Sequence, residues 1–168
     1  MGVTGPLGAA TAGVEVLKRH KKRFSRWSAP LVKAQNRPLA RLKEGRILGK
    51  NRGVHAVMDL SDGLDVSLQL MGEASRVGFE INVDQLPIVP SVRRWAGLRY
   101  RKYWDYALHG GEDYELMFTV EPRAWKALQK QLPRARIIGE VKRKAFGIQE
   151  RAGSEIAPLQ VKSFEHFA

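Results

Sequence analysis

The stretch Val54-His55-Ala56-Val57-Met58-Asp59-Leu60-Ser61-Asp62-Gly63-Leu64 joins a strand pattern directly to a helix pattern. Its first seven residues are mostly apolar, which is typical of a β-strand buried on both faces. Ser61-Asp62-Gly63 supplies a turn. An apolar stripe that begins at Leu64 then predicts a helix, with Gly78 as its C-terminal stop.

Outward from this stretch, helix and strand patterns follow one another without an internal repeat or a clear linker. Periodicity predicts further helices over 7–19, 39–48, 91–108 (in two pieces) and 122–132. Alternation predicts further strands over 79–84, 114–120, 136–141 and 146–150. This order favours a single α+β domain with a mixed or antiparallel sheet.

Composition excludes several classes of protein. The chain has 168 residues, 43% of them hydrophobic, which suffices for one globular domain. It has no cysteine, so disulfides, thiolate zinc sites and cysteine nucleophiles are excluded. No apolar run approaches the roughly 20 residues of a membrane span. The first residues lack the pattern of a signal peptide. We therefore expect a cytoplasmic protein without a membrane anchor.

The positive charge is concentrated in one tract. Residues 18–52 hold 13 lysines and arginines and a single acid, Glu44, so this tract accounts for the whole net charge of +12. Such a tract attracts phosphates, including those of nucleic acids. It is also what a solvated helix end and connector look like. Aromatic residues are not interleaved along it in the manner of a nucleic-acid-binding strand, so a nucleic-acid partner is not expected.

Two acidic motifs adjoin predicted strands. In the first, Asp59, Ser61 and Asp62 follow the strand at 54–60, and two carboxylates with a hydroxyl can hold Mg²⁺. The alternative is structural, with Ser61 or Asp62 as the N-cap of the next helix. In the second, Gly110-Gly111-Glu112-Asp113-Tyr114-Glu115-Leu116, paired glycines allow a sharp turn or a close approach to a ligand. The alternative there is an ordinary turn with solvated acids.

Together the two motifs resemble the C-terminal half of thiamine-monophosphate kinases, a family related to aminoimidazole ribonucleotide synthetase. Their order and approximate spacing match that family. Weaker similarities occur at Val3–Gly8, at Arg37-Pro38 and at Ser163–Phe167. The resemblance implies a three-layer α/β/α domain of the α+β class with a mixed sheet.

The resemblance also implies an activity and a set of site residues. Members of the family use ATP to phosphorylate thiamine monophosphate to thiamine diphosphate by direct in-line transfer. By analogy Asp59 and Asp62 would bind Mg²⁺, and Ser61 would contact ATP. Glu112 would contact the cationic thiamine moiety, and Phe164 would pack on its rings. Gly111 and Asp113 would support these residues.

The family's N-terminal ATP- and Mg²⁺-binding domain has no counterpart in this sequence. We therefore expect residues 1–168 to form a single C-terminal domain that is inactive alone and needs the missing half, or a separate chain that supplies it. Full-length members of the family are homodimers. The alternative function is an inactive stand-alone module that binds RNA or another polyanion through residues 18–52.

Overall fold

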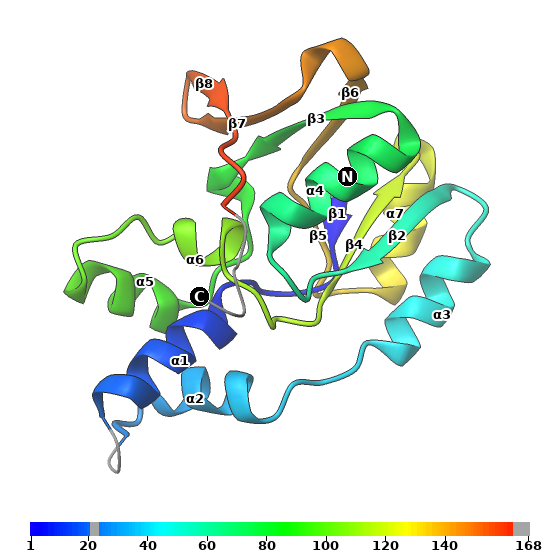
Figure 1. Ribbon diagram of the computed structural model, residues 1–168. Coiled ribbons are helices and arrows are strands. Elements are labelled where there is room, and N and C mark those ends of the chain that lie inside the picture. Colours follow the sequence, from blue (N-terminus) through cyan, green and yellow to red (C-terminus); the bar gives the residue numbers. More distant parts are fainter. Residues whose placement is uncertain (21–23, 163–168) are drawn as a thin grey trace.

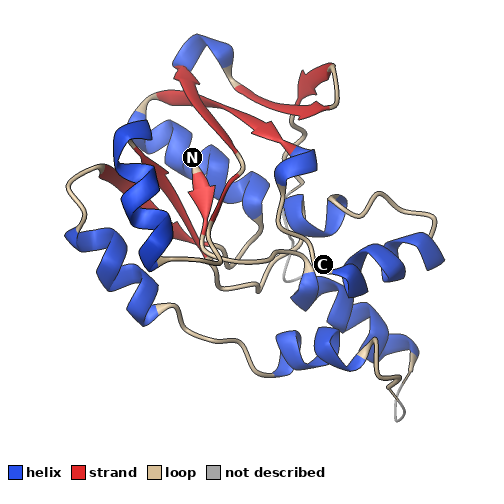
Figure 2. Ribbon diagram, turned by 180° about the vertical axis from the view of Figure 1, so that it is seen from behind, coloured by secondary structure: helices blue, strands red, loops and turns tan. Residues whose placement is uncertain are grey.

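The computed structural model describes residues 1–20 and 24–162 (Figures 1 and 2). The helices in these residues are α1 (Ala9–Arg19), α2 (Ala29–Asn36), α3 (Leu42–Lys50), α4 (Leu64–Ser75), α5 (Pro90–Leu98), α6 (Asp105–Leu108) and α7 (Pro122–Gln131). The strands are β1 (Gly2–Val3), β2 (Val54–Asp59), β3 (Val77–Asn82), β4 (Leu116–Val120), β5 (Arg136–Ile137), β6 (Gly139–Arg143), β7 (Ile148–Ala152) and β8 (Glu155–Pro158). Short 3-10 helices span Val83–Gln85 and Lys144–Phe146.

The described strands form two four-stranded sheets. The first has the order β2-β4-β1-β5 and is antiparallel throughout. The second has the order β6-β3-β7-β8, in which β3 and β7 run parallel and the other pairs antiparallel. The mixed sheet expected from the sequence is therefore the second one, and the motif-bearing strands β2 and β4 belong to the antiparallel one.

Helices cover both faces of the first sheet, which confirms the expected three-layer α/β/α arrangement and α+β class (Figure 1). Successive residues of a strand point to opposite faces. On β4, Met117 joins a core built with α4 and β3, whereas Phe118 packs with residues of α3 and α7. The second sheet lies across α4, where Leu68 and Phe79 share the same core.

A third cluster forms outside the sheets, among α1, α2, α5 and α6. Val16, Leu31, Trp95 and Tyr106 are all buried in it. Helix α2 was not expected, because a single helix, over 39–48, was predicted in the tract 28–53, which contains Pro30 and several other prolines and glycines. The proline instead occupies the first turn of α2, where its missing N–H costs nothing.

Two local predictions were wrong. The strand at 54–60 was expected to be buried on both faces, but β2 lies at the edge of its sheet and exposes alternate residues such as Val57. Ala56 and Met58 pack on the core from the other face. The helix after Leu64 ends at Ser75 rather than at Gly78. Arg76 takes the left-handed conformation at its C-terminus, with φ of 57°.

Candidate functional site

The two motifs are joined through their backbones at one rim of the first sheet. The N–H of Glu112 donates to the carbonyl of Ser61 at 2.7 Å. Leu60 donates to the carbonyl of Glu115 at 2.9 Å and accepts from the N–H of Tyr114 at 3.0 Å. These bonds continue the β2–β4 pairing past the ends of both strands, so residues about 50 positions apart in the sequence share one short edge.

Gly111 makes this close approach possible. A Cβ placed there would lie 2.5 Å from the carbonyl oxygen of Ser61, far inside van der Waals contact. The turn that follows is tightly wound, because Glu112 and Tyr114 both have positive φ, of 65° and 50°. Gly111 therefore allows one motif to contact the other, whereas the sequence led us to expect a sharp turn or a close approach to a ligand.

In the first motif, Asp59 and Asp62 are exposed and Ser61 is half-buried. The Ser61 hydroxyl lies 3.4 Å from Oδ2 of Asp62. The alternative interpretation, in which Ser61 or Asp62 caps the next helix, is wrong. The N-cap of α4 is Gly63, with φ of 111° and no side-chain cap. Neither residue is used to begin the helix.

Asp65, which the sequence analysis did not single out, is a buried acid in the first turn of α4. Its Oδ1 accepts from the N–H of Val66 at 2.8 Å, and its Oδ2 lies 2.8 Å from Nδ1 of His109. The N–H of Lys162 also donates to Oδ2, at 2.9 Å. Asp65 therefore connects α4, the segment before the second motif, and the chain just ahead of residue 163. Its place three residues after Asp62, in the first helical turn, was the available signal.

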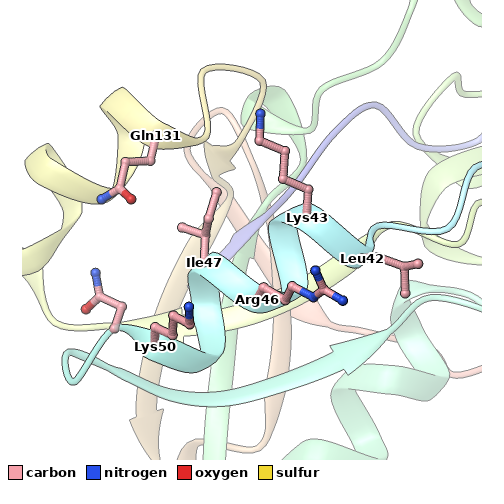
Figure 3. A pocket seen from close by; sticks show the side chains of 7 residues that line it. Leu42, Lys43, Arg46, Ile47, Lys50 and Gln131 are labelled. Atoms are coloured by element: carbon pink, nitrogen blue, oxygen red, sulfur yellow. The ribbon is translucent and has the colours of Figure 1, made fainter.

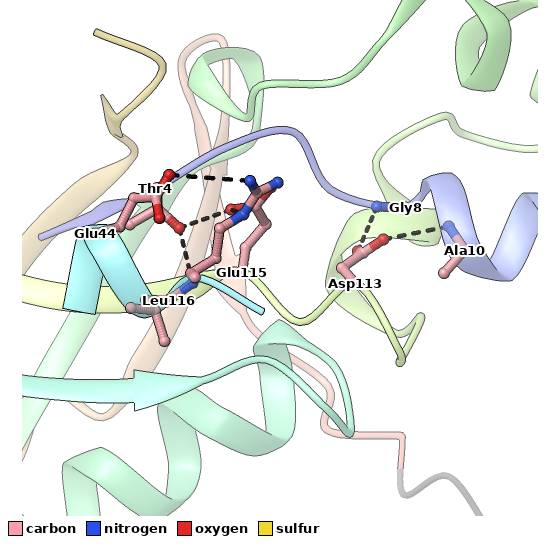
Figure 4. A network of polar contacts seen from close by, with 8 residues as sticks. Thr4, Gly8, Ala10, Glu44, Asp113, Glu115 and Leu116 are labelled. Carbon is pink, nitrogen blue, oxygen red and sulfur yellow. Dashed lines mark hydrogen bonds and ion pairs between the residues drawn. The ribbon is translucent and has the colours of Figure 1, made fainter. Parts of the chain in front are cut away.

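Asp113 caps the N-terminus of α1, which lies more than 100 residues earlier in the sequence. Its Oδ2 accepts from the N–H of Gly8 at 2.6 Å, and its Oδ1 accepts from the N–H of Ala10 at 3.2 Å, both at the N-terminus of α1 (Figure 4). Burial raises the pKa of Asp113 to about 7, although the two N–H bonds work in the opposite direction by favouring the charged form. The supporting role expected for Asp113 has this helix terminus as its physical basis.

Glu115 forms a buried ion pair in the same network (Figure 4). Arg41 donates from Nε to Oε2 at 2.8 Å and from Nη2 to Oε1 at 2.6 Å. The hydroxyl of Thr4 donates to Oε2 at 2.7 Å and accepts from the N–H of Leu116 at 2.8 Å. This network fixes β1, α3 and β4 together, and neither Arg41 nor Thr4 was anticipated as part of it. Arg41 lies four residues after Arg37 of the Arg37-Pro38 similarity, and this closeness was the available signal for its role.

Asp113 bonds backbone N–H groups and Glu115 pairs with an arginine, whereas Glu112 of the same motif bonds an uncharged side chain. Glu112 is half-buried, and its Oε2 accepts a hydrogen bond from Nε2 of Gln35 at 2.5 Å. Gln35 lies on α2, the helix that was not expected.

The rim suits Mg²⁺ in kind but supplies only part of a coordination shell. Asp59 and Asp62 offer hard carboxylate oxygens. Over residues 1–20 and 24–162, no three histidine, aspartate or glutamate side chains gather closely enough to hold a metal ion. Mg²⁺ keeps several waters and takes one or two carboxylates plus substrate phosphates, so two carboxylates fit its needs only with ligands from elsewhere.

Two hollows lie near these elements. One of about 270 Å³ adjoins the second motif and is lined by Pro6, Ala10, Arg37, Arg41, Asp113 and Glu115, among other residues. Another, of about 530 Å³, lies between α3 and the end of α7 (Figure 3). Its walls carry Lys43, Arg46 and Lys50, whose spacing puts them on one side of α3.

The fold and the two joined motifs agree with the comparisons with known proteins. Residues 2–149 match the family described as AIR synthase related protein, C-terminal domain. The chain belongs to this family.

Among individual relatives, the chain is similar to thiamine-monophosphate kinases. That of Escherichia coli (strain K12) is 32% identical over 171 residues, covering 99% of this chain and 51% of that protein. That of Nitrosopumilus maritimus (strain SCM1) is 31% identical over 168 residues, covering 98% and 52%. The structure of AaThiL complexed with AMPPCP and TMP matches with a TM-score of 0.83 and 29% identity, covering 99% of this chain and 50% of that one. The resemblance inferred from the motifs is confirmed, and the chain spans about half the length of these relatives.

Asp59, Ser61, Asp62 and Glu112 lie on the two segments that meet at the rim, and their ligands stay predictions. Phe164 lies outside the described residues. In the described part of the chain, no helix is both long enough and apolar enough to span a membrane.

Proposed function

We propose that this chain is the C-terminal domain of a thiamine-monophosphate kinase, which transfers a phosphoryl group from ATP to thiamine monophosphate in the cytoplasm. The observation that carries the proposal is the backbone junction of the two motifs, with Glu112 bonded to Ser61 at 2.7 Å. The likeness of the whole chain to thiamine-monophosphate kinases, including AaThiL complexed with AMPPCP and TMP, supports it.

In this proposal the exposed acids Asp59 and Asp62 bind Mg²⁺, and Ser61 contacts ATP. Bound Mg²⁺ supplies neutralisation of the phosphate charge. Phosphoryl transfer asks chiefly for positioning and charge stabilisation, so a rim of carboxylates without a nucleophile suits it. We propose further that an N-terminal half, or a separate chain, completes the site and forms the homodimer; the incomplete donor set among the described residues supports the part that concerns the site.

Glu112 is proposed to hold the cationic ring of thiamine monophosphate, and Phe164 to pack on it. The position of Lys162, two residues before Phe164, supports the role proposed for Phe164. The N–H of Lys162, two residues earlier, is anchored to Asp65 in the first turn of α4. That turn directly follows Ser61 and Asp62, so Lys162 lies next to the proposed site.

The test uses the natural polypeptide that carries this sequence, purified at its natural length. We expect it to form thiamine diphosphate and ADP in equal amounts from thiamine monophosphate and ATP, with no product once EDTA removes Mg²⁺. Thiamine, which lacks the accepting phosphate, should give no product. The isolated 1–168 chain should show no turnover. A natural polypeptide that is folded and binds neither substrate would contradict the proposal.

A second candidate function, polyanion binding, rests on the hollow beside α3. Lys43, Arg46 and Lys50 make no ion pair with any residue that the structure describes. Figure 3 shows the three side chains on α3, with Ile47 on the same helix pointing toward Gln131. Three unpaired cations on one helix face are complementary to a run of phosphates.

Its test measures the affinity of the chain for a single-stranded RNA oligonucleotide at several salt concentrations. Replacing all three residues by glutamine should weaken binding at least about 10-fold and reduce the slope of log K against log salt by about 2. The matched control replaces three exposed cations near the second sheet, Arg76, Arg143 and Lys144. Equal losses in both variants would mean that net charge alone attracts the RNA.

A further inference from the structure

Gln35 on α2 is the side-chain partner of Glu112. Its Nε2 donates to Oε2 of Glu112 at 2.5 Å, across a sequence separation of 77 residues. The sequence places Gln35 inside the basic tract, whose role the motifs leave open. This contact gives α2 a direct connection to the rim.

The packing of α2 against α1 fixes where Gln35 lies. Gly13 of α1 touches α2 so closely that a Cβ there would fall 2.2 Å from the carbonyl oxygen of Leu31 and 3.2 Å from Cβ of Gln35. Leu31 is fully buried in the cluster that α1 and α2 share. The base of the Gln35 side chain is therefore held by the helix pair, and its amide reaches outward to Glu112.

The same helix pair holds the rest of the turn. On α1, the hydroxyl of Thr11 donates to the carbonyl of Gly111 at 3.3 Å, and the N–H groups of Gly8 and Ala10 bind Asp113. Residues on both sides of Glu112 are thus attached to α1. The carboxylate of Glu112 is instead bonded to α2, through Gln35.

The amide of Gln35 has one workable orientation. Its Oε1 is buried and has no hydrogen-bond partner among the described residues. Reversing the amide would place that oxygen against the Glu112 carboxylate, where two acceptors repel. A buried acceptor without a partner is unfavourable. Gln35 therefore keeps this orientation because of its bond to Glu112.

A neutral partner has a chemical consequence. Arg41 neutralises Glu115 in the same motif, whereas the amide of Gln35 fixes the Glu112 carboxylate and leaves its negative charge intact. A fixed, half-buried carboxylate that keeps its charge attracts a cationic ring.

We propose that Gln35 is a positioning residue, which orients the Glu112 carboxylate toward the cationic ring of the substrate without neutralising it. Gln35 does not itself touch the substrate. This inference rests on the proposed function, in which Glu112 receives the thiamine moiety.

The test compares two variants of the natural full-length polypeptide. Gln35→Met keeps the volume and removes the donor, so the KM for thiamine monophosphate should rise about 5-fold or more, while kcat and the KM for ATP change less than about 2-fold. Gln35→Lys keeps a donor but neutralises the carboxylate, so the same KM should rise while the domain stays at least as stable.

The matched control is Gln69→Met on α4. Nε2 of Gln69 donates to Oε1 of Glu73 at 3.0 Å on an exposed face, so the same type of bond is lost away from the rim. All kinetic constants should stay unchanged there. If Gln35→Met does not fold, Gln35→Lys alone decides the matter.

An active wild type with an unchanged KM in the folded Gln35 variants would overturn this inference and leave the proposed function standing. A folded wild type that binds neither substrate would instead overturn the proposed function, and this inference with it. A uniform fall in kcat for every variant, the control included, would also count against a positioning role.

Discussion

Asp59 and Asp62 are exposed where β2 ends, whereas Asp113 and Glu115, on the adjoining segment, hold distant parts of the chain in place. Asp113 caps α1 and Glu115 pairs with Arg41. Acids of the same type, in two motifs that touch, thus differ in what their charge is used for. Asp113 and Glu115 hold the rim in shape, and the exposed carboxylates of Asp59 and Asp62 can meet a ligand.

The largest effect we expect is on catalysis, from the exposed pair. Under the proposed function, Asp59→Asn and Asp62→Asn should each lower kcat of the natural polypeptide that carries this sequence about 100-fold or more, because a metal ligand supports several kcal/mol of charge stabilisation. Both side chains are exposed, so the midpoint of urea unfolding should not move. Coupled assays and denaturation of the same samples check both statements. Full activity in either variant would remove that residue from the metal site.

The buried ion pair between Glu115 and Arg41 should matter for stability rather than for catalysis. Glu115→Gln leaves Arg41, in a largely enclosed place, with only the more distant carboxylate of Glu44 at 3.9 Å, and should lower the free energy of unfolding by about 3 kcal/mol. The control is Glu140→Gln, which breaks an exposed pair with Lys142 and should leave the urea midpoint where it was. A stable Glu115→Gln variant would mean that this ion pair does not hold the rim together.

A glycine comparison tests the junction of the two motifs. Gly111→Ala forces a methyl group to within 2.5 Å of the carbonyl oxygen of Ser61, so it should destabilise the domain by about 1–3 kcal/mol. Gly49→Ala, in α3, meets no atom within 4 Å and should stabilise it by about 0.5–1 kcal/mol. Urea unfolding measures both. Equal shifts in the two variants would show that the close contact at Gly111 carries no energetic weight.

The most gradual effect is a pH dependence from Asp113. Its folded-state pKa of about 7 lies above the unfolded value of about 3.8, so the folded state keeps a proton that the unfolded state releases between these values. The free energy of unfolding should therefore fall as pH rises from 4 to 7, by at most about 1.4 kcal/mol per pH unit from this group.

Asp113→Asn should remove that contribution, so the difference in stability between variant and wild type should change across the window from pH 4 to pH 7. Urea unfolding at four pH values would show it. A constant difference would mean that Asp113 is ionised throughout, held so by the N–H groups of α1.

Local patterns of the sequence determined much of this protein. The strand predicted over 54–60, the helix that begins at Leu64 and the helix at Pro122–Gln131 lie where the apolar run and the helical periodicity predicted them. The two motifs and the family were also apparent from the sequence, since motif residues adjoin strand ends and are read in order along the chain.

Tertiary structure alone decided the division of labour among the acids. No local pattern shows that Asp113 reaches the N-terminus of α1, that Glu115 meets Arg41, or that Gln35 meets Glu112, because each contact joins segments more than 70 residues apart. The short strand β1 was missed for the same reason: two residues have no periodicity, and partners on both sides make them a strand. Sequence fixes which side chains are available, and long-range packing decides which of them keep their charge for a ligand.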